Sequence, residues 1–200
     1  MAELPLQIGI TGGIGSGKSL VCRIFSCLGI PVYEADSRAI YLANHDASTK
    51  NKILGLLGPK AYDSEGLYDR PYVSSQVFGD PERLRALNEI IHPAVRKDTQ
   101  QWVMQHQMSP YIVKEAAIMN AAGDGNNLDY VVLVTAPESL RTDRVMRRDG
   151  RDLEQIKSIM ARQATDQQRQ AIADYTIIND GHCMLIPQIL NLHQKFLGVR

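Results

Sequence analysis

Short runs of aliphatic and β-branched residues alternate along the chain with longer segments of helical periodicity. Five runs are predicted as strands: Leu6–Ile10, Ile30–Glu34, Tyr111–Glu115, Tyr130–Thr135 and Tyr175–Asn179. Nearly continuous apolar runs separated by helices are typical of a buried parallel sheet with helices on both faces. The pattern therefore predicts an α/β fold with a five-stranded parallel sheet flanked by helices.

The spacing of these runs is uneven. About 75 residues separate the second run from the third, far more than one crossover helix requires. In this segment Asp80 and Pro81 are typical of an N-cap and first residue of a helix that runs towards Gln107. His92-Pro93 is expected to kink or break that helix. The sequence therefore predicts a helical insertion large enough to form a second binding surface.

The first run leads directly into a glycine-rich segment, Gly12–Ser19, which matches G-x-x-x-x-G-K-[ST] in full and precedes a predicted helix that closes at Leu28-Gly29. Glycine at positions 12, 13, 15 and 17 permits positive φ and lets backbone N–H groups face an anion. Lys18 supplies a cation for the β- and γ-phosphates, and Ser19 offers a hydroxyl to Mg²⁺. A glycine-rich turn that binds nothing is the alternative. The strand–loop–helix context favours a P-loop for a nucleoside triphosphate, without identifying the nucleotide or the phosphate acceptor.

Acidic residues follow two of the predicted strands. Asp36 comes after the second strand and Glu115 ends the third, and ligands of a parallel sheet bind outside the carboxyl ends of its strands. Asp36 could accept a proton from an attacking hydroxyl or position Mg²⁺, or it could only cap the helix that begins at Ser37. Glu115 suits the water shell of Mg²⁺. The sequence does not explain why Lys114 lies in a buried run.

A basic segment, residues 144–162, separates the fourth and fifth runs. Its Asp152-Leu153-Glu154-Gln155 resembles a capping box that starts a new helix. Arg144, Arg147, Arg148 and Arg151 cluster here. Such a cluster can be a solvated face neutralised by nearby aspartates, but beside a phosphate site it favours a mobile lid that closes over the phosphates.

Composition and charge limit the possible partners. The hydrophobic and charged fractions, 44% and 22%, are ordinary for a globular protein. Lys+Arg and Asp+Glu both total 22, so the net charge is zero and a nucleic-acid partner is not expected. No run approaches the roughly 18 apolar residues that span a bilayer, and no signal peptide is evident. Cys22, Cys27 and Cys183 match neither a disulfide framework nor a metal motif. We therefore expect a cytoplasmic protein without a membrane partner.

The motifs occur in an ordered set that resembles the dephospho-CoA kinase family. Ile8–Ser19 followed by Leu28–Asp36 looks like the amino-terminal part of that family. The later matches are Gly66–Arg70, Val77-Phe78, Ile91–Arg96, Arg148–Gly150, Ala173–Tyr175 and Asn179–Gly181, so the set spans nearly the whole chain. The resemblance rests on the order of these motifs along the chain more than on the P-loop, which occurs in many families.

The resemblance implies a P-loop NTPase fold with a core (residues 1–35, 111–140 and 173–200), a helical acceptor-binding subdomain (36–110) and a lid (141–172). It implies ATP-dependent phosphorylation of the ribose 3′-hydroxyl of dephospho-CoA, the last step of coenzyme A synthesis. The expected cofactor is Mg²⁺, and the expected partners are ATP and dephospho-CoA. The chain is expected to act as a monomer or small homo-oligomer.

The resemblance also implies roles for individual residues. Asp36 is the expected catalytic base, and Lys18 and Arg148 are the other expected catalytic residues. The expected ATP-binding residues are Gly13, Ile14, Gly15, Ser16, Gly17, Lys18, Ser19, Leu20, Arg144, Asn179 and Gly181. Those expected to bind the acceptor are Thr11, Asp36, His92 and Arg96; Ser19, and Glu115 through water, are expected to bind the metal.

The chain departs from the family pattern at three places. Glu34 replaces the usual first Asp of an Asp-Ala-Asp motif, Leu20 replaces the usual Thr, and the segment after the third strand lacks the usual Glu, so no role passes to Asn120. Another small-molecule P-loop kinase, such as a nucleoside monophosphate kinase, is the alternative. A GTPase-like switch would need a guanine-binding [NT]-K-x-D motif, which is missing, and a non-enzymatic binding module would need neither base nor lid.

Overall fold

The computed structural model describes residues 4–116 and 119–199. Residues 1–3 of the predicted core, residue 200, and residues 117–118 of the segment after the third strand lie outside the described residues. The chain forms two compact units: a core unit, residues 1–33 with 106–200, and a helical unit, residues 34–105.

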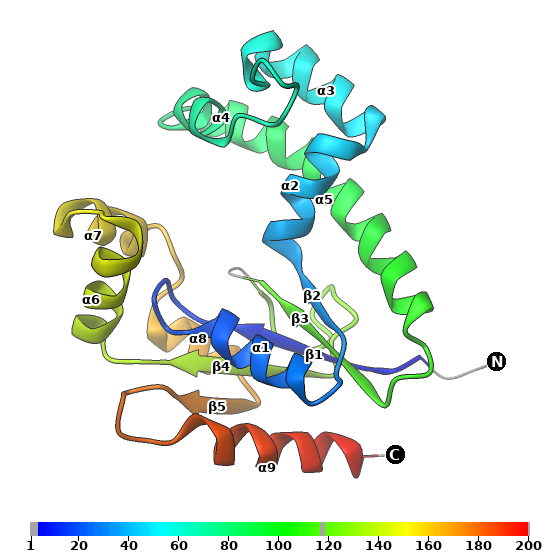
Figure 1. The fold of residues 1–200 in the computed structure, drawn as a ribbon, viewed down its shortest axis with the longest axis vertical. Helices are drawn as coiled ribbons and strands as arrows, with labels where there is room; N and C mark the ends of the chain where they lie inside the picture. Colours follow the sequence, from blue (N-terminus) through cyan, green and yellow to red (C-terminus); the bar gives the residue numbers. More distant parts are fainter. Residues whose placement is uncertain (1–3, 117–118, 200) are drawn as a thin grey trace. The chain divides into compact units, whose positions relative to one another are not determined.

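The sheet has five strands: β1 (Leu6–Thr11), β2 (Val32–Glu34), β3 (Tyr111–Glu115), β4 (Tyr130–Thr135) and β5 (Tyr175–Ile178). Their order is β2-β3-β1-β4-β5, so β1 lies in the centre (Figure 1). β1 pairs in parallel with β3 and β4, and β4 pairs in parallel with β5. The predicted five-stranded parallel sheet is confirmed. Because β1 is central, the loop that follows it emerges from the middle of the carboxyl edge.

Three predicted strand boundaries were wrong. β1 ends at Thr11, one residue after the predicted Ile10. β2 begins at Val32 instead of Ile30, because the Ile30 N–H donates to the Phe25 carbonyl at the end of α1 (Lys18–Cys27) and Pro31 has no N–H. β5 ends at Ile178, one residue before Asn179. The apolar Ile30 thus extended the second predicted strand slightly beyond the sheet.

Alternate residues of the strands face opposite sides of the sheet. Ile8, Val113 and Val132 belong to a buried cluster on the face covered by α1 and α9 (Leu185–Leu197), together with Phe25 and Phe196. Each fully buried aliphatic or aromatic side chain of this kind contributes about 1.5–3 kcal/mol. This packing anchors α1, and with it the loop before α1, to the sheet.

The other face explains the charged residue in the third strand. The Lys114 ammonium donates to the Gln7 side chain at 2.5 Å, and Gln7 also donates its backbone N–H to Asp129 at 2.7 Å. Burial lowers the pKa of Lys114, although the nearby Asp129 carboxylate opposes that shift. Lys114 therefore belongs to a polar cluster that joins β1, β3 and the start of β4.

Three further helices belong to the core unit: α6 (Glu138–Asp149), α7 (Leu153–Ala161) and α8 (Asp166–Ile172). The predicted capping box at Asp152 and Gln155 is confirmed at the start of α7. A second capping box, formed by Thr165 and Gln168, starts α8 and was not predicted. The segment after residue 152 thus contains two helices, each with its own start signal.

The helical unit contains α2 (Ala35–His45), α3 (Ala47–Leu57), η1 (Pro59–Ala61), α4 (Arg70–Val77) and α5 (Pro81–Gln105). Its own buried cluster includes Ala43, Ile53 and Val73. The Asp80 side chain accepts the Arg83 N–H at 3.0 Å, so the predicted start of α5 is confirmed. α5 continues through Pro93, so the helix is not broken there; that the proline kinks it stays a prediction. Leu87 and Val103, on either side of the proline, are buried, and burial of such side chains stabilises a helix from which a proline removes one hydrogen bond.

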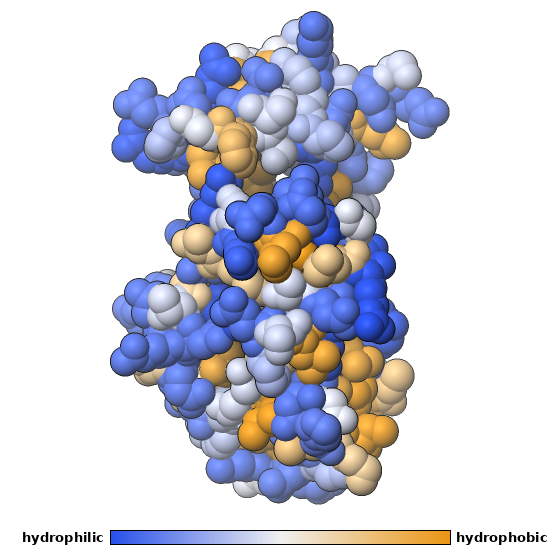
Figure 2. All heavy atoms as spheres, turned by 90° about the vertical axis from the view of Figure 1, so that its left-hand side faces the viewer, coloured by the Kyte–Doolittle hydropathy of each residue, from blue (hydrophilic) through white to orange (hydrophobic). Residues whose placement is uncertain are grey.

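Figure 2 shows a face on which hydrophilic side chains predominate and hydrophobic ones form small groups. Across residues 4–116 and 119–199, no helix combines the length and apolar character needed to cross a membrane.

Candidate nucleotide-binding site

The glycine-rich loop between β1 and α1 has the geometry of a phosphate cradle. Gly15 and Gly17 have φ of 76° and 99°, in the left-handed region that glycine tolerates best. Gly13 does not have positive φ, contrary to expectation; a Cβ there would lie 2.3 Å from an Nη atom of Arg141. The Lys18 ammonium donates to the Gly12 carbonyl at 2.9 Å. Two of these glycines thus serve backbone conformation, and Gly13 serves close packing.

Asn179 ties the loop to α6. Its Nδ2 donates to the Ser16 carbonyl at 2.7 Å, and its Oδ1 accepts from Arg144 at 3.2 Å. Arg144 also donates to the Asn179 carbonyl at 3.1 Å and to the Gly15 carbonyl at 3.4 Å. The structure therefore brings together two residues predicted to bind ATP, and both contact the phosphate loop directly.

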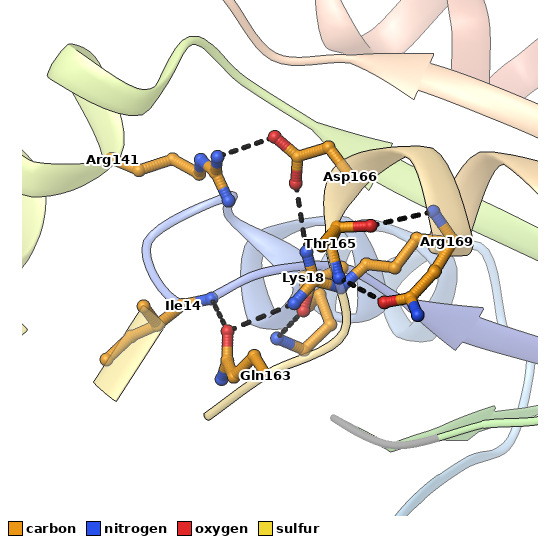
Figure 3. A network of polar contacts seen from close by, with 9 residues as sticks. Ile14, Lys18, Arg141, Gln163, Thr165, Asp166 and Arg169 are labelled. Atoms are coloured by element: carbon orange, nitrogen blue, oxygen red, sulfur yellow. Dashed lines mark hydrogen bonds and ion pairs between the residues drawn. The ribbon is translucent and has the colours of Figure 1, made fainter. Parts of the chain in front are cut away.

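Four residues beside the loop were missed by the sequence analysis: Arg141 at the start of α6, and Gln163, Asp166 and Arg169 around the start of α8 (Figure 3). Both arginines are buried, with 5% and 4% of their surface exposed. Burial lowers the pKa of the Arg169 guanidinium, while Asp166 opposes that shift. In the sequence these residues look like those of a solvated helix, and only the unpredicted Thr165–Gln168 capping box marks the segment.

The predicted metal ligands lie together. The Ser19 hydroxyl donates to a Glu115 carboxylate oxygen at 3.3 Å. Oxygen donors of this kind suit Mg²⁺, which completes its shell with waters and substrate phosphates. Among residues 4–116 and 119–199, no group of three or more His, Cys, Asp or Glu side chains could hold a metal ion. That Ser19 and Glu115 hold a metal together with the substrate stays a prediction.

Arg148 lies at the end of α6 and is paired within its own turn. Its guanidinium makes two hydrogen bonds to the Asp149 carboxylate, at 2.7 and 2.9 Å. The pairing raises the pKa of Arg148 and lowers that of Asp149. The Arg148 side chain is 64% exposed, so this ion pair is accessible to an incoming anion. Arg147 pairs separately, with Asp143 at 3.1 Å.

The remaining predicted ATP-binding residues flank the loop. The Leu20 N–H already donates to the Gly17 carbonyl at 3.1 Å, within the first turn of α1, and its side chain is exposed. Gly181 lies just after β5 with φ of 87°. Leu20 thus follows the loop directly, and Gly181 lies two residues after Asn179.

Residues predicted to bind the acceptor are divided between the two units. Thr11 is buried at the end of β1, in the core unit. Asp36 lies in the first turn of α2, whose N-cap is Glu34, so the interpretation of Asp36 as a helix cap was wrong. His92 and Arg96 are exposed and one turn apart on α5. That these side chains approach the phosphate loop stays a prediction.

Comparisons with known proteins agree with the motifs. A family model described as dephospho-CoA kinase matches residues 6–184. The dephospho-CoA kinase of Porphyromonas gingivalis is 39% identical over 94% of this chain and 92% of its own length. That of Chlorobaculum tepidum is 38% identical over 99% of this chain and 98% of its own length.

A solved structure, TT1252 from Thermus thermophilus, has a TM-score of 0.82 at 29% identity and covers 98% of this chain and 97% of its own. Similarity over nearly the full length extends well beyond the P-loop, which many unrelated kinases share. The chain belongs to the dephospho-CoA kinase family.

Proposed function

We propose that the chain transfers the γ-phosphate of ATP to the ribose 3′-hydroxyl of dephospho-CoA, giving CoA and ADP. The phosphate loop carries this proposal: Gly15 and Gly17 adopt the required backbone, Lys18 lies at its end, and Asn179 and Arg144 brace it. Membership of the dephospho-CoA kinase family supports the choice of acceptor.

Each side chain has a defined part in the reaction. The acceptor hydroxyl oxygen forms a bond to the γ-phosphorus, the bond to the β–γ bridging oxygen breaks, and ADP leaves. Asp36 takes the hydroxyl proton as general base. When ATP binds, the Lys18 ammonium leaves the Gly12 carbonyl and contacts the β- and γ-phosphates. The Arg148 guanidinium leaves the Asp149 carboxylate and stabilises the negative charge that develops on the transferred phosphoryl group.

Mg²⁺ is the proposed cofactor, held by Ser19 and, through water, by Glu115. Bound with ATP, it would neutralise phosphate charge. The hydrogen bond between Ser19 and Glu115 supports this pairing, because it brings two oxygen donors to one place at the carboxyl edge of β3.

The acceptor is proposed to bind the helical unit through His92 and Arg96. A groove of about 510 Å³ runs along α5, and its lining includes Leu84, His92 and Pro93. Its apolar surface at Leu84 and Pro93 suits an organic chain, and Arg85 in its lining and the nearby Arg96 suit an anion. Thr11 and Asp36 would contact the ribose end of the same acceptor.

A coupled assay for ADP release tests the function. Purified protein with ATP, Mg²⁺ and dephospho-CoA is expected to turn over, and CoA should appear in equal amount by mass spectrometry. AMP and shikimate serve as alternative acceptors, with expected rates near background. Turnover with either, and none with dephospho-CoA, would replace the proposal with another P-loop kinase activity.

A cytoplasmic location and a monomeric or small oligomeric state are proposed with this function. All three cysteines, which lie in the described part of the chain, are free thiols, as a reducing compartment would keep them. Sedimentation of the purified chain with and without ATP tests the oligomeric state.

A further inference from the structure

We propose that Arg141, Gln163, Asp166 and Arg169 form a positioning cluster that holds the Gly13–Gly15 part of the phosphate loop in the conformation that accepts ATP. The proposal rests on the proposed kinase function, since it assigns how the ATP side of that site is kept in order. None of these four residues was expected to take part, and they come from two segments that approach the loop from α6 and α8.

The cluster contacts the loop at three consecutive residues. The Gln163 Oε1 accepts the Ile14 backbone N–H at 3.0 Å. An Nη atom of Arg141 lies 2.3 Å from the position of a Cβ at Gly13, and the Arg141 carbonyl lies 2.5 Å from that at Gly15. A side chain at either glycine would collide with the cluster. The loop and the cluster therefore pack as one body.

One carboxylate organises the charges of the cluster. Asp166 accepts from Arg141 at 2.7 Å and from Arg169 at 2.9 Å, although its own side chain is 58% exposed. Arg169 also donates to the Gln163 Oε1 at 3.2 Å, which orients that oxygen towards Ile14. Two buried cations and one anion leave an excess positive charge beside the loop, as a triphosphate site requires.

The cluster is not arranged for stability alone. The Nε atoms of both arginines and the Ser16 hydroxyl are buried without a hydrogen-bond partner among the described residues. Such groups cost free energy in a folded protein, and apolar side chains of similar shape would avoid that cost. The retained charge and the contacts with the loop point to nucleotide binding as the reason for the arrangement.

Substitutions of Gln163 best distinguish an effect on the position of the phosphate loop from an effect on the stability of the whole protein. Gln163→Met removes the acceptor for the Ile14 N–H while nearly conserving volume. Gln163→Glu keeps an acceptor for both Ile14 and Arg169 but adds a negative charge beside the phosphates. Gln155→Met is the matched control, because Gln155 also accepts a backbone N–H, that of Asp152, within the cap of α7 and away from the loop.

The affinity for a non-hydrolysable ATP analogue is measured by calorimetry, together with KM for ATP, KM for dephospho-CoA, kcat and Tm. Gln163→Met is expected to weaken analogue binding and raise KM for ATP about tenfold, the effect of one lost hydrogen bond. KM for dephospho-CoA should stay within twofold, and Tm should fall no further than in Gln155→Met. Gln163→Glu should keep Tm but also weaken analogue binding about tenfold.

Two outcomes would overturn the proposal: analogue affinity of Gln163→Met equal to that of Gln155→Met, or KM values for both substrates rising in parallel with the loss of Tm. Failure of the proposed function is recognised separately, because the wild-type chain would then bind the ATP analogue without phosphorylating dephospho-CoA. The calorimetric comparison of the variants still judges the cluster in that case.

Discussion

Replacing Asn179 with alanine tests how the phosphate loop is supported. The Asn179 side chain is buried and joins the Ser16 carbonyl, 163 residues earlier in the chain, to Arg144 on α6. Asn179→Ala removes both hydrogen bonds without introducing a clash, so the change in unfolding free energy reports these contacts.

The magnitude follows from what each partner loses. The Ser16 carbonyl loses its 2.7 Å donor inside the protein, which costs about 1–3 kcal/mol. Arg144 keeps the Asn179 and Gly15 carbonyls, so its loss is about 0.5–1 kcal/mol. The expected destabilisation is about 1.5–4 kcal/mol, or a fall in Tm of roughly 3–16 °C for a chain of this size.

Urea unfolding followed by circular dichroism is the suitable assay, because Trp102 lies on α5 in the helical unit and its fluorescence does not report the loop. Asn120→Ala is the control. Asn120 is exposed, and its side-chain Nδ2 donates a hydrogen bond to the Asp124 carbonyl at 3.3 Å, so the unfolding free energy should change by no more than about 0.5 kcal/mol. Asn179→Asp should destabilise at least as much as the alanine variant, since a carboxylate oxygen would then face the Ser16 carbonyl. If the unfolding free energy of Asn179→Ala lies within about 0.5 kcal/mol of the wild-type value, the range expected for a surface substitution, the reasoning is refuted.

Three further predictions concern single residues. Asp36→Asn should lower kcat by about 10²–10⁴ if Asp36 is the general base, with KM for ATP little changed; an unchanged kcat in the ADP assay would remove it from that role. Lys18→Ala should abolish phosphoryl transfer while the circular dichroism spectrum stays that of wild type, and retained transfer would mean that another cation serves the phosphates. Burial raises the pKa of Tyr62 to about 12, so its neutral form favours the folded state. The contribution of Tyr62 to the unfolding free energy should therefore be fully present below pH 10 and decrease as the pH rises from 10 towards 12. Tyr62→Phe, which lacks the bond to the Ala43 carbonyl, should lose that component of the pH dependence, and an unchanged alkaline profile would count against it.

Local signals determined the elements and the phosphate loop. The limits of β3 and β4, the start of α5 at Asp80-Pro81 and the cap of α7 follow from apolar runs and capping chemistry within a few residues of each other. The loop follows from glycine spacing, because its backbone N–H groups bind phosphate wherever a strand and a helix flank it.

Tertiary packing decided what local chemistry left open. The sequence alone did not predict the order β2-β3-β1-β4-β5, and α5 passes through Pro93, where the local rule predicts a kink or a break. A proline inside a helix costs one helical hydrogen bond, but whether the helix continues depends on side chains that pack from elsewhere in the chain.

The same distinction separates the predicted site residues from those that only the structure revealed. Lys18 and Ser19 are recognisable from their neighbours in sequence. Gln163 is not, because its partner Ile14 lies 149 residues away, and Arg141 resembles any surface arginine until it is buried against Gly13. The sequence by itself predicted the phosphate loop, since its glycine spacing and one lysine are adjacent in the chain. Only the fold decided which distant charges hold the loop in place, because desolvation and pairing of charges depend on neighbours that the chain brings together in space.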